Sequence, residues 1–233
     1  MTGSPFYKAR ALLGRATRVS LRGALLVFAL LLGGIGAWET AVEFARPDPG
    51  RITVADSETR LSATRAAAAG DAARRAVVRG DLWADHAVAL VGPTAAEPAP
   101  SEQAIARARA AAARAVRLAP HEARAWLVLA DLAERTAPPK ESAGPLRMAF
   151  FTDPANFDLL PWRIAVGTRS EAITDDEIER LTERDIRLIA AREGGTAVLA
   201  DAYRAASPEG RAVIERTTEQ IDSALAAAVR ATD

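Results

Sequence analysis

The first strong signal in the hydrophobic pattern is a segment near the start of the chain that is apolar on every face of a helix. Residues 23–38 carry no charge and have only apolar or glycine side chains, and residues 19–22 extend this segment. About 20 residues of helix cross roughly 30 Å of hydrocarbon, and a helix buried in a soluble domain is seldom apolar all round. The pattern predicts a transmembrane anchor over residues 23–38.

From residue 57 onward, apolar residues recur at helical spacing, and proline or glycine separates one segment from the next. Gly70 and Gly80 are expected to divide the first segment, and Gly92-Pro93 is expected to open a loop. The expected helices cover residues 57–91, 101–118, 122–135, 144–152, 156–168, 174–192, 196–206 and 208–230. Because the connections are short and no strand pattern appears, the chain is expected to be all-α and built of antiparallel helical hairpins.

Two of these helix starts carry capping signals. Thr174 and Glu177 have the spacing of a capping box, in which each side chain accepts a hydrogen bond from the other residue's backbone amide. Ser207 precedes Pro208, which is the order of an N-cap followed by a proline at the first helical position. Both positions are therefore predicted to begin helices.

The composition agrees with a helical fold. Of the 233 residues 55 are alanine, and 28 of the 30 basic residues are arginine. Alanine and arginine favour helices, whereas 2 Tyr, 6 Phe and 4 Trp are few for a β-sandwich or barrel. The absence of cysteine excludes a disulfide framework, a thiolate nucleophile and a cysteine-based metal site.

The formal net charge of zero hides an asymmetry along the chain. Residues 1–22 hold five basic side chains and no acidic one, so the remainder of the chain carries −5. By the positive-inside rule this basic segment is cytoplasmic, and Trp38 suits the opposite interface. The expected arrangement is a single-pass protein of a bacterial inner membrane, with residues 39–56 as a linker and residues 57–233 as a periplasmic helical domain.

A cleavable signal peptide is the alternative interpretation of the same segment. Its apolar region would cover about residues 24–32, and Gly34 to Gly36 would supply small residues near a cleavage site. The long basic segment and the apolar continuation to Trp38 favour a retained anchor. Both interpretations export the rest of the chain.

Residues 108–154 carry a more specific spacing. Small residues and a proline match the second half of one repeat unit at Ala108, Ala112, Ala115 and Pro120. The next unit has Trp126, Leu129, Ala130 and Ala133 in its first helix and Leu146, Ala149 and Pro154 in its second. Pro120 and Pro154 are 34 residues apart, and the segment from about residue 101 to 156 resembles a tetratricopeptide repeat (TPR).

The resemblance implies a TPR-like α-solenoid, in which alanines let paired helices approach closely and prolines end each second helix. The chain departs from the repeat pattern at the proline-rich segment 93–100 and at Ser142, which stands where a later small residue is expected. A generic helical bundle is the alternative. In the repeat interpretation, residues 57–91 and 156–230 are degenerate repeats or caps.

A second resemblance rests on the order of segments. A basic N-terminus, one apolar span, an alanine-rich hairpin and then residues 146–166 with the acidic helix from residue 174 together resemble small membrane-anchored proteins of bacterial exopolysaccharide synthesis. This resemblance implies a role in assembling or regulating a polysaccharide export apparatus.

Catalytic motifs are not evident in the sequence. His86 and His121 lie in different segments without a second ligand at helical spacing, so no metal site is expected. The acidic residues 175–179 are those favoured in the first turn of a helix. Because phosphate-binding loops and nucleophile motifs are also absent from the sequence, we expect no catalytic residue and no cofactor, and therefore no enzyme.

Two groups of side chains are candidates for a binding surface. Arg107 and Arg114 belong to a basic helix face that suits an anionic glycan, a lipid or a protein. Phe151 and Trp162 belong to an aromatic group that either fills the core or forms a protein- or sugar-binding groove. The complete groups are Arg107, Arg109, Arg114 and Arg117, and Phe150, Phe151, Phe157 and Trp162.

The sequence therefore predicts a membrane-anchored, periplasm-facing scaffold that binds a protein partner at the membrane, with glycan contact left open. Nucleic acid is not an expected partner, because the exported part is net negative. Two alternatives remain: a periplasmic glycan-active enzyme, which needs two carboxylates about 5–10 Å apart, and a membrane adaptor that faces the cytoplasm.

Overall fold

The computed structural model describes residues 5–44, 46, 59–96, 101–136 and 142–231. Within these ranges the chain is entirely helical, with α-helices α1 to α11, two short 3₁₀ helices and no strand. The all-α prediction is therefore confirmed for the described residues. The chain divides into two compact units, residues 1–45 and residues 46–233.

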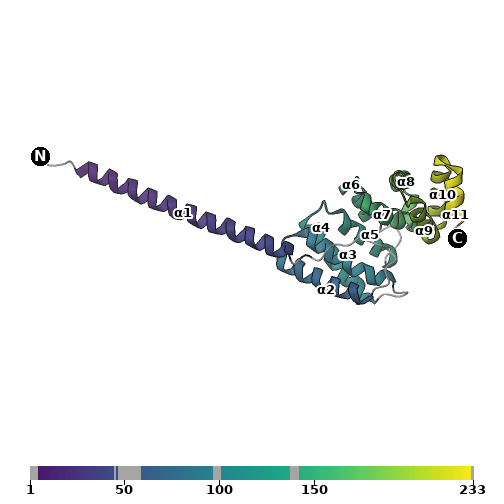
Figure 1. The fold of residues 1–233 in the computed structure, drawn as a ribbon, viewed down its shortest axis with the longest axis horizontal. Coiled ribbons are helices and arrows are strands. Elements are labelled where there is room, and N and C mark those ends of the chain that lie inside the picture. The colour runs from purple at the N-terminus through teal and green to yellow at the C-terminus, as the bar shows by residue number, and fades with distance from the viewer. Residues whose placement is uncertain (1–4, 45, 47–58, 97–100, 137–141, 232–233) are drawn as a thin grey trace. The chain divides into compact units, whose positions relative to one another are not determined.

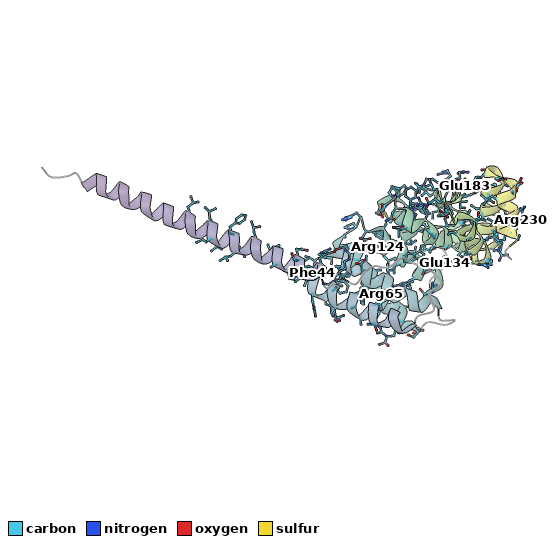
Figure 2. All side chains as sticks on the ribbon, in the orientation of Figure 1. Phe44, Arg65, Arg124, Glu134, Glu183 and Arg230 are labelled. Carbon is cyan, nitrogen blue, oxygen red and sulfur yellow. The ribbon has the colours of Figure 1, made fainter. Side chains whose placement is uncertain are left out.

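The first unit is a single long helix, α1 (Pro5–Phe44, 40 residues). Its part Gly23–Phe44, 22 residues, is long and apolar enough to cross a membrane, although a signal sequence meets the same criteria. Side chains project from this part of α1 on opposite sides of the helix (Figure 2). Residues 39–44, which were expected to begin a linker, are helical, and residues 47–56 of that linker lie outside the described ranges.

The second unit consists of ten α-helices in the described part of the chain (Figure 1). They are α2 (Thr59–Ala76), α3 (Gly80–Ala96), α4 (Glu102–Leu118), α5 (Ala123–Thr136), α6 (Ala143–Thr152), α7 (Leu160–Arg169), α8 (Asp176–Ala190), α9 (Gly195–Ala205), α10 (Pro208–Ile221) and α11 (Ser223–Arg230). The 3₁₀ helices η2 (Phe157–Leu159) and η3 (Glu171–Thr174) lead into α7 and α8.

The helices of this unit pack mainly on their near neighbours in sequence. Helix α3 contacts α4 and α5, α5 contacts α6 and α7, and α7 contacts α8 and α9. Helix α6 also contacts α8, and α8 contacts α10. Each helix in this series therefore contacts the next helix, the next but one, or both. The first and last helices of the unit, α2 and α11, lie toward opposite ends of it (Figure 1).

Two hydrophobic clusters hold the unit together. The first joins α3 to α8 and includes Ala108, Ala112, Leu127, Val128, Leu132, Leu146, Ala149, Phe150, Trp162, Val166 and Ile178. The second joins α7 to α11 and includes Leu160, Ile164, Ile173, Ile186, Ile189, Leu199, Tyr203, Val213, Ile214 and Val229. Burial of this apolar surface is the main favourable contribution to folding.

Two expected helix breaks differ in the structure. Helix α2 continues through Gly70, where a Cβ atom would lie 2.8 Å from Cε1 of His86, so this glycine makes room for the imidazole. Helix α3 continues through Gly92-Pro93 to Ala96. The break between α2 and α3 comes at Val77, whose φ of 45° is unusual for a β-branched residue.

The caps also differ in part from the prediction. Helix α8 is capped by Asp175 and not by Thr174: an Asp175 carboxylate oxygen accepts hydrogen bonds from the amides of Glu177 (3.0 Å) and Ile178 (3.2 Å). The N-cap at Ser207 is confirmed, because its Oγ accepts from the Gly210 amide at 3.0 Å. The last predicted helix is two helices, since Asp222 interrupts it and caps α11 through the Ala224 amide.

Candidate interaction surface

The residues that carry the repeat-like spacing lie where helices approach one another. Ala108, Ala112 and Ala115 of α4 are fully buried, as are Ala130 of α5 and Ala149 of α6. Alanine has no side chain beyond Cβ, so it permits a short separation between helix axes. Leu129 and Trp126 are partly buried and pack against the first cluster.

The prolines of this spacing follow the ends of α4 and α6. Helix α4 ends at Leu118, and the residue before Pro120, Ala119, has φ −139° and ψ 83°. Helix α6 ends at Thr152, and the residue before Pro154, Asp153, has φ −147° and ψ 68°. A residue before proline is driven out of the helical region, so both helices stop for the same reason. Pro120 and Pro154 themselves are exposed.

Trp126 joins the first of these prolines to the following helix. Its indole Nε1 donates a hydrogen bond to the carbonyl oxygen of Pro120 at 2.7 Å. The bond fixes the start of α5 against the turn that follows α4. The one polar atom of the Trp126 side chain is therefore satisfied by a backbone carbonyl.

The arginines predicted on α4 are distributed over both ends of the helix. Arg107 lies beside Gln103 on the exposed side, and Arg109 donates to Oγ1 of Thr136 at 2.5 Å. Arg114 instead lies over the ring of Trp83, with Cζ 4.6 Å from the ring centroid, a cation–π contact. The four arginines therefore do not form one continuous binding site.

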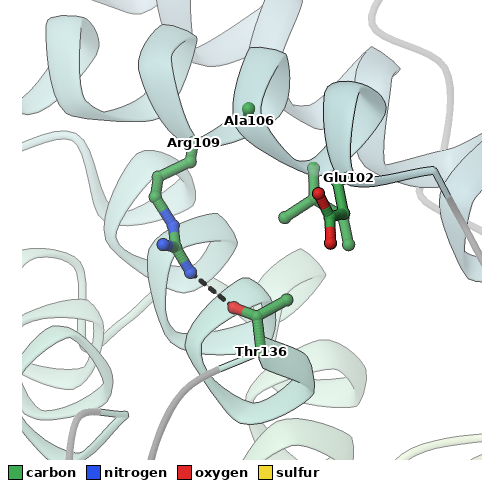
Figure 3. A pocket seen from close by; sticks show the side chains of 5 residues that line it. Glu102, Ala106, Arg109 and Thr136 are labelled. Atoms are coloured by element: carbon green, nitrogen blue, oxygen red, sulfur yellow. Dashed lines mark hydrogen bonds between the residues drawn. The ribbon is translucent and has the colours of Figure 1, made fainter.

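A shallow cavity of about 430 Å³ lies between the first half of α4 and the end of α5 (Figure 3). Its lining residues are Glu102, Ile105, Ala106, Arg109 and Thr136. Figure 3 shows the Arg109 side chain directed to the Thr136 hydroxyl across one side of this cavity. Glu102 is the single carboxylate among the five lining residues.

The predicted aromatic group divides between core and surface. Phe150 is fully buried and Trp162 is 8% exposed, and both belong to the first cluster. Of the two roles that the sequence left open for this group, core or binding surface, Trp162 therefore has the core role, because α7 directs it against the helices that precede it. Phe151 and Phe157 are 54% and 47% exposed, and Arg192 lies 4.7 Å from the Phe157 ring centroid.

Phe151 is part of an exposed apolar strip on α6. Residues at i, i+4 and i+7 lie on one side of a helix, and on this side Gly144, Met148 and Phe151 of α6 are all exposed. We call these three residues the α6 strip. Arg147, at i+3 on the same side of α6, is paired with Asp175 at 3.0 Å and with Glu177, so the charge beside the strip is neutralised.

Buried aspartates between helices are the feature that sequence reasoning missed. Asp131 of α5 is 1% exposed and forms salt bridges with Arg135, at 3.0 Å, and with Arg169 of α7. Asp85 of α3 is 8% exposed and forms salt bridges with Arg46, at 2.8 Å, and with Arg124 of α5. Each aspartate thus links one helix to the next but one.

A third aspartate, Asp185 of α8, is fully buried together with Arg163 of α7. Its Oδ2 accepts from Nε of Arg163 at 2.7 Å, and its Oδ1 accepts from Arg184 at 3.0 Å. Arg163 also donates to the Asp153 carbonyl at 2.8 Å, at the end of α6. The Arg163–Asp185 pair, of which neither side chain is exposed, therefore connects three consecutive helices.

Arginine also affects the ionisation of Asp81 at the start of α3. Burial acts to raise the pKa of Asp81, but the hydrogen bond from Arg79 and the charges of Arg79 and Arg46 outweigh it and hold this pKa below its ordinary value. Burial acts to lower the pKa of Arg124, but Glu122 and Asp85 raise it above its ordinary range. These groups are accordingly charged in neutral solution (Figure 2 labels Arg124).

The acidic residues 175–179 serve the local structure of α8. The amides of Ile178 and Glu177 and the charge of Arg147 hold the pKa of Asp175 below its ordinary value. Glu177 forms a salt bridge with Arg147, and Glu179 with Arg216. Over the described residues, no group of three or more His, Asp or Glu side chains is arranged to hold a metal ion.

The two histidines lie apart from each other. Nδ1 of His86 is 3.1 Å from the Ala66 carbonyl, and burial, together with the charge of Arg74, lowers the His86 pKa. His121 is exposed in the turn before α5. No protein-family model matches this chain, and no curated protein and no solved structure is significantly similar to it.

Proposed function

We propose that the chain is a membrane-anchored protein whose second unit is a TPR-like α-solenoid that binds a protein partner. Three features support this proposal. The segment Gly23–Phe44 has the length and polarity of a span, consecutive helices contact the next and the next but one as in a solenoid, and the ends of α4 and α6 repeat at a 34-residue interval.

The α6 strip is the observation that carries the binding role. Met148 is 37% exposed and Phe151 54% exposed on a helix whose opposite side, with Leu146, Ala149 and Phe150, is fully buried. The side chains of Met148 and Phe151 are apolar, and the neighbouring Arg147 is already paired with Asp175 and Glu177. The strip therefore suits apolar side chains of a protein better than an anionic glycan or nucleic acid. Aromatic anchors of this kind dominate the affinity of many protein interfaces.

The five basic residues before Gly23 favour a cytoplasmic N-terminus and an exported second unit. Together with the order of segments, which resembles small membrane-anchored proteins of exopolysaccharide synthesis, this supports a partner in envelope polysaccharide assembly. A reporter fused after Asp233 tests the topology: alkaline phosphatase activity supports it, and fluorescence of a cytoplasmic reporter contradicts it.

A glycan-hydrolysing enzyme is not proposed, because no observation favours it. The cavity beside α4 supplies one carboxylate, Glu102, where such a reaction requires two flanking the sugar bond.

The partner is tested by photocrosslinking in intact cells. A photoreactive amino acid at Phe151 is expected to give a discrete crosslinked product, whereas the same amino acid at the exposed Ala110 of α4 is not. Met148→Glu is expected to abolish the product from position 151 without lowering the unfolding temperature, because Met148 is on the surface. Equal products from both positions, or a product that survives M148E, would contradict the role of the α6 strip.

A further inference from the structure

The start of the second unit is fixed to one particular place on it. Arg46 is the first residue of this unit, and its guanidinium forms salt bridges with Asp85 at 2.8 Å and with Asp81 at 3.5 Å. Both aspartates belong to the first turns of α3. Arg46 is therefore held at the N-terminal end of α3.

Arg46 is also close to the end of the apolar segment, whatever the angle between the two units. Phe44 is the last residue of the candidate span, and two virtual Cα–Cα bonds separate it from Arg46, so the two Cα atoms are at most about 7.6 Å apart. A span that ends at Phe44 places Arg46, and with it the start of α3, at the membrane surface.

Four helix ends meet at the start of α3. Helix α2 ends just before it, and α4 ends against it: a Cβ atom on Gly80 would lie 2.5 Å from Cβ of Ala119. Arg114 near the end of α4 donates to the carbonyl of Val77 at 3.5 Å, and Arg124 in the first turn of α5 reaches Asp85. We call this region, residues 74–81 and 114–124 with Arg46, the tethered end.

The tethered end exposes large apolar side chains. Val77 and Val78 are 54% and 63% exposed in the turn between α2 and α3, and Leu118 is 38% exposed at the end of α4. Val77 and Val78 share one turn and Leu118 is the last residue of α4, and apolar side chains exposed to water contribute little to the core. They are available to an apolar environment outside the domain.

The charge at the tethered end is basic. Its carboxylates, Asp81 and Glu122, are each in a salt bridge with an arginine. Arg75 and Arg117 are exposed and have no carboxylate partner among the described residues. Exposed arginines beside exposed apolar side chains match the surface of a bilayer with anionic headgroups.

We infer that the tethered end docks on the membrane surface: Val77, Val78 and Leu118 enter the interfacial layer, and Arg75 and Arg117 bind lipid phosphates. The inference rests on the proposed function, since it requires that α1 remains in the bilayer. Docking fixes the orientation of the helical domain, so that α4 stands with its end toward the lipid and its start away from it.

The absence of cysteine from the chain permits an unambiguous test. The full chain, with a single cysteine carrying an environment-sensitive fluorophore, is reconstituted in nanodiscs of phosphatidylcholine with phosphatidylglycerol. The label is placed at Leu118, at the matched control Gln103 on the same helix, and at Leu30 in the apolar segment. Positions 103 and 118 are exposed and about 22 Å apart along the helix axis.

Lipids with a spin label near the headgroup are expected to quench the fluorophore at position 118 and not at 103, and lipids with a spin label deep in the acyl chain are expected to quench it at position 30. If the fluorophore is quenched at position 30 but is quenched equally, or not at all, at positions 118 and 103, the docking is overturned and the membrane anchor is still supported. Absent quenching at 30 overturns the anchor and the docking together.

A charge variant tests the role of the arginines. Arg75→Gln and Arg117→Gln are each expected to lower the docked-to-undocked ratio at position 118 about fivefold, the ratio that corresponds to ~1 kcal/mol per arginine at an anionic surface. The matched control Arg107→Gln, at the far end of α4, is expected to leave the ratio unchanged. An equal effect of all three substitutions, or none, would overturn the phosphate contacts.

Discussion

Helices α4 and α8 are both packed between neighbours, but they bury opposite kinds of side chain. The buried residues of α4 are four alanines, Ala108, Ala111, Ala112 and Ala115. The buried residues of α8 are three isoleucines, a threonine and a charged aspartate, Asp185. Helix α4 therefore contributes close approach of backbones, whereas α8 contributes side-chain volume and an ion pair.

This difference indicates where each half of the second unit is vulnerable. Where alanines separate two helices, an added methylene group has no space, so overpacking is the damaging change. Where isoleucines fill the space, removal of atoms leaves a cavity. All stability changes below refer to chemical unfolding of the full chain in detergent, followed by circular dichroism.

The largest effect is expected from Asp185→Ala in α8. The substitution leaves the fully buried guanidinium of Arg163 without its carboxylate, which costs about 3–5 kcal/mol of unfolding free energy. Replacing both partners by apolar residues, as in Arg163→Met with Asp185→Leu, is expected to recover most of this loss. Asp201→Ala, which removes an exposed ion pair, serves as the control and is expected to change stability by less than about 0.5 kcal/mol.

Ile186→Ala tests the cavity side of the comparison. Ile186 is fully buried in the second cluster, so its truncation is expected to destabilise the protein by about 2–5 kcal/mol. Leu188→Ala, two residues along α8 and 37% exposed, is expected to cost much less. Similar losses for the two substitutions would mean that α8 does not depend on the volume it buries.

Ala112→Leu tests whether the buried alanines of α4 are needed for the close approach of neighbouring helices. The added atoms have to enter the interface of α4 with its neighbours, and we expect a loss of about 1–3 kcal/mol. The matched substitution Ala110→Leu on the exposed side of the same helix is expected to be nearly neutral. If A112L were neutral as well, the alanines of α4 would not be required for packing.

Val77→Gly is expected to stabilise the turn between α2 and α3. Glycine adopts the left-handed conformation of this residue, φ 45°, without the penalty of a β-branched side chain, and the net gain is up to about 1 kcal/mol. Val78→Gly, at the neighbouring position, is the control and is expected to give no gain. A loss of stability in V77G would show that Val77 makes a contact that outweighs its strain.

The smallest effect concerns His86, which lies beside α2. Because its folded-state pKa is below its ordinary value of 6.5, the unfolded chain binds a proton more readily than the folded one as the pH falls through 6.5. Stability is therefore expected to decrease in this range and to be restored as the pH rises again. His86→Gln should flatten the dependence of the denaturation midpoint on pH just below neutrality, and an unchanged slope would contradict the assignment.

The helices of the second unit were largely predictable because proline, glycine and capping residues act locally. Ser207-Pro208 began a helix as expected, and Pro120 follows the end of α4. Two helix boundaries were predicted at the wrong residue because neighbouring residues can also cap a helix there. Asp175 and Thr174 are both acceptable caps, and the aspartate one residue further on accepts two amides, while Asp222 caps a new helix where the apolar pattern continues without interruption.

The ion pairs between helices were not predictable from the pattern. Nothing in the residues that flank Asp85, Asp131 and Asp185 marks them as buried, and their partners are up to 39 residues away in sequence. The buried position of Phe150 and the exposed position of Phe151 have the same origin, because these adjacent aromatic residues differ only in the helix face that tertiary packing covers.

The residues before Pro120 and Pro154 leave their helices with nearly the same backbone angles. The same local geometry therefore ends two helices 34 residues apart. A residue inserted between Asp153 and Pro154 would move the proline away from the position whose backbone it restricts, so α6 is expected to run on beyond Thr152.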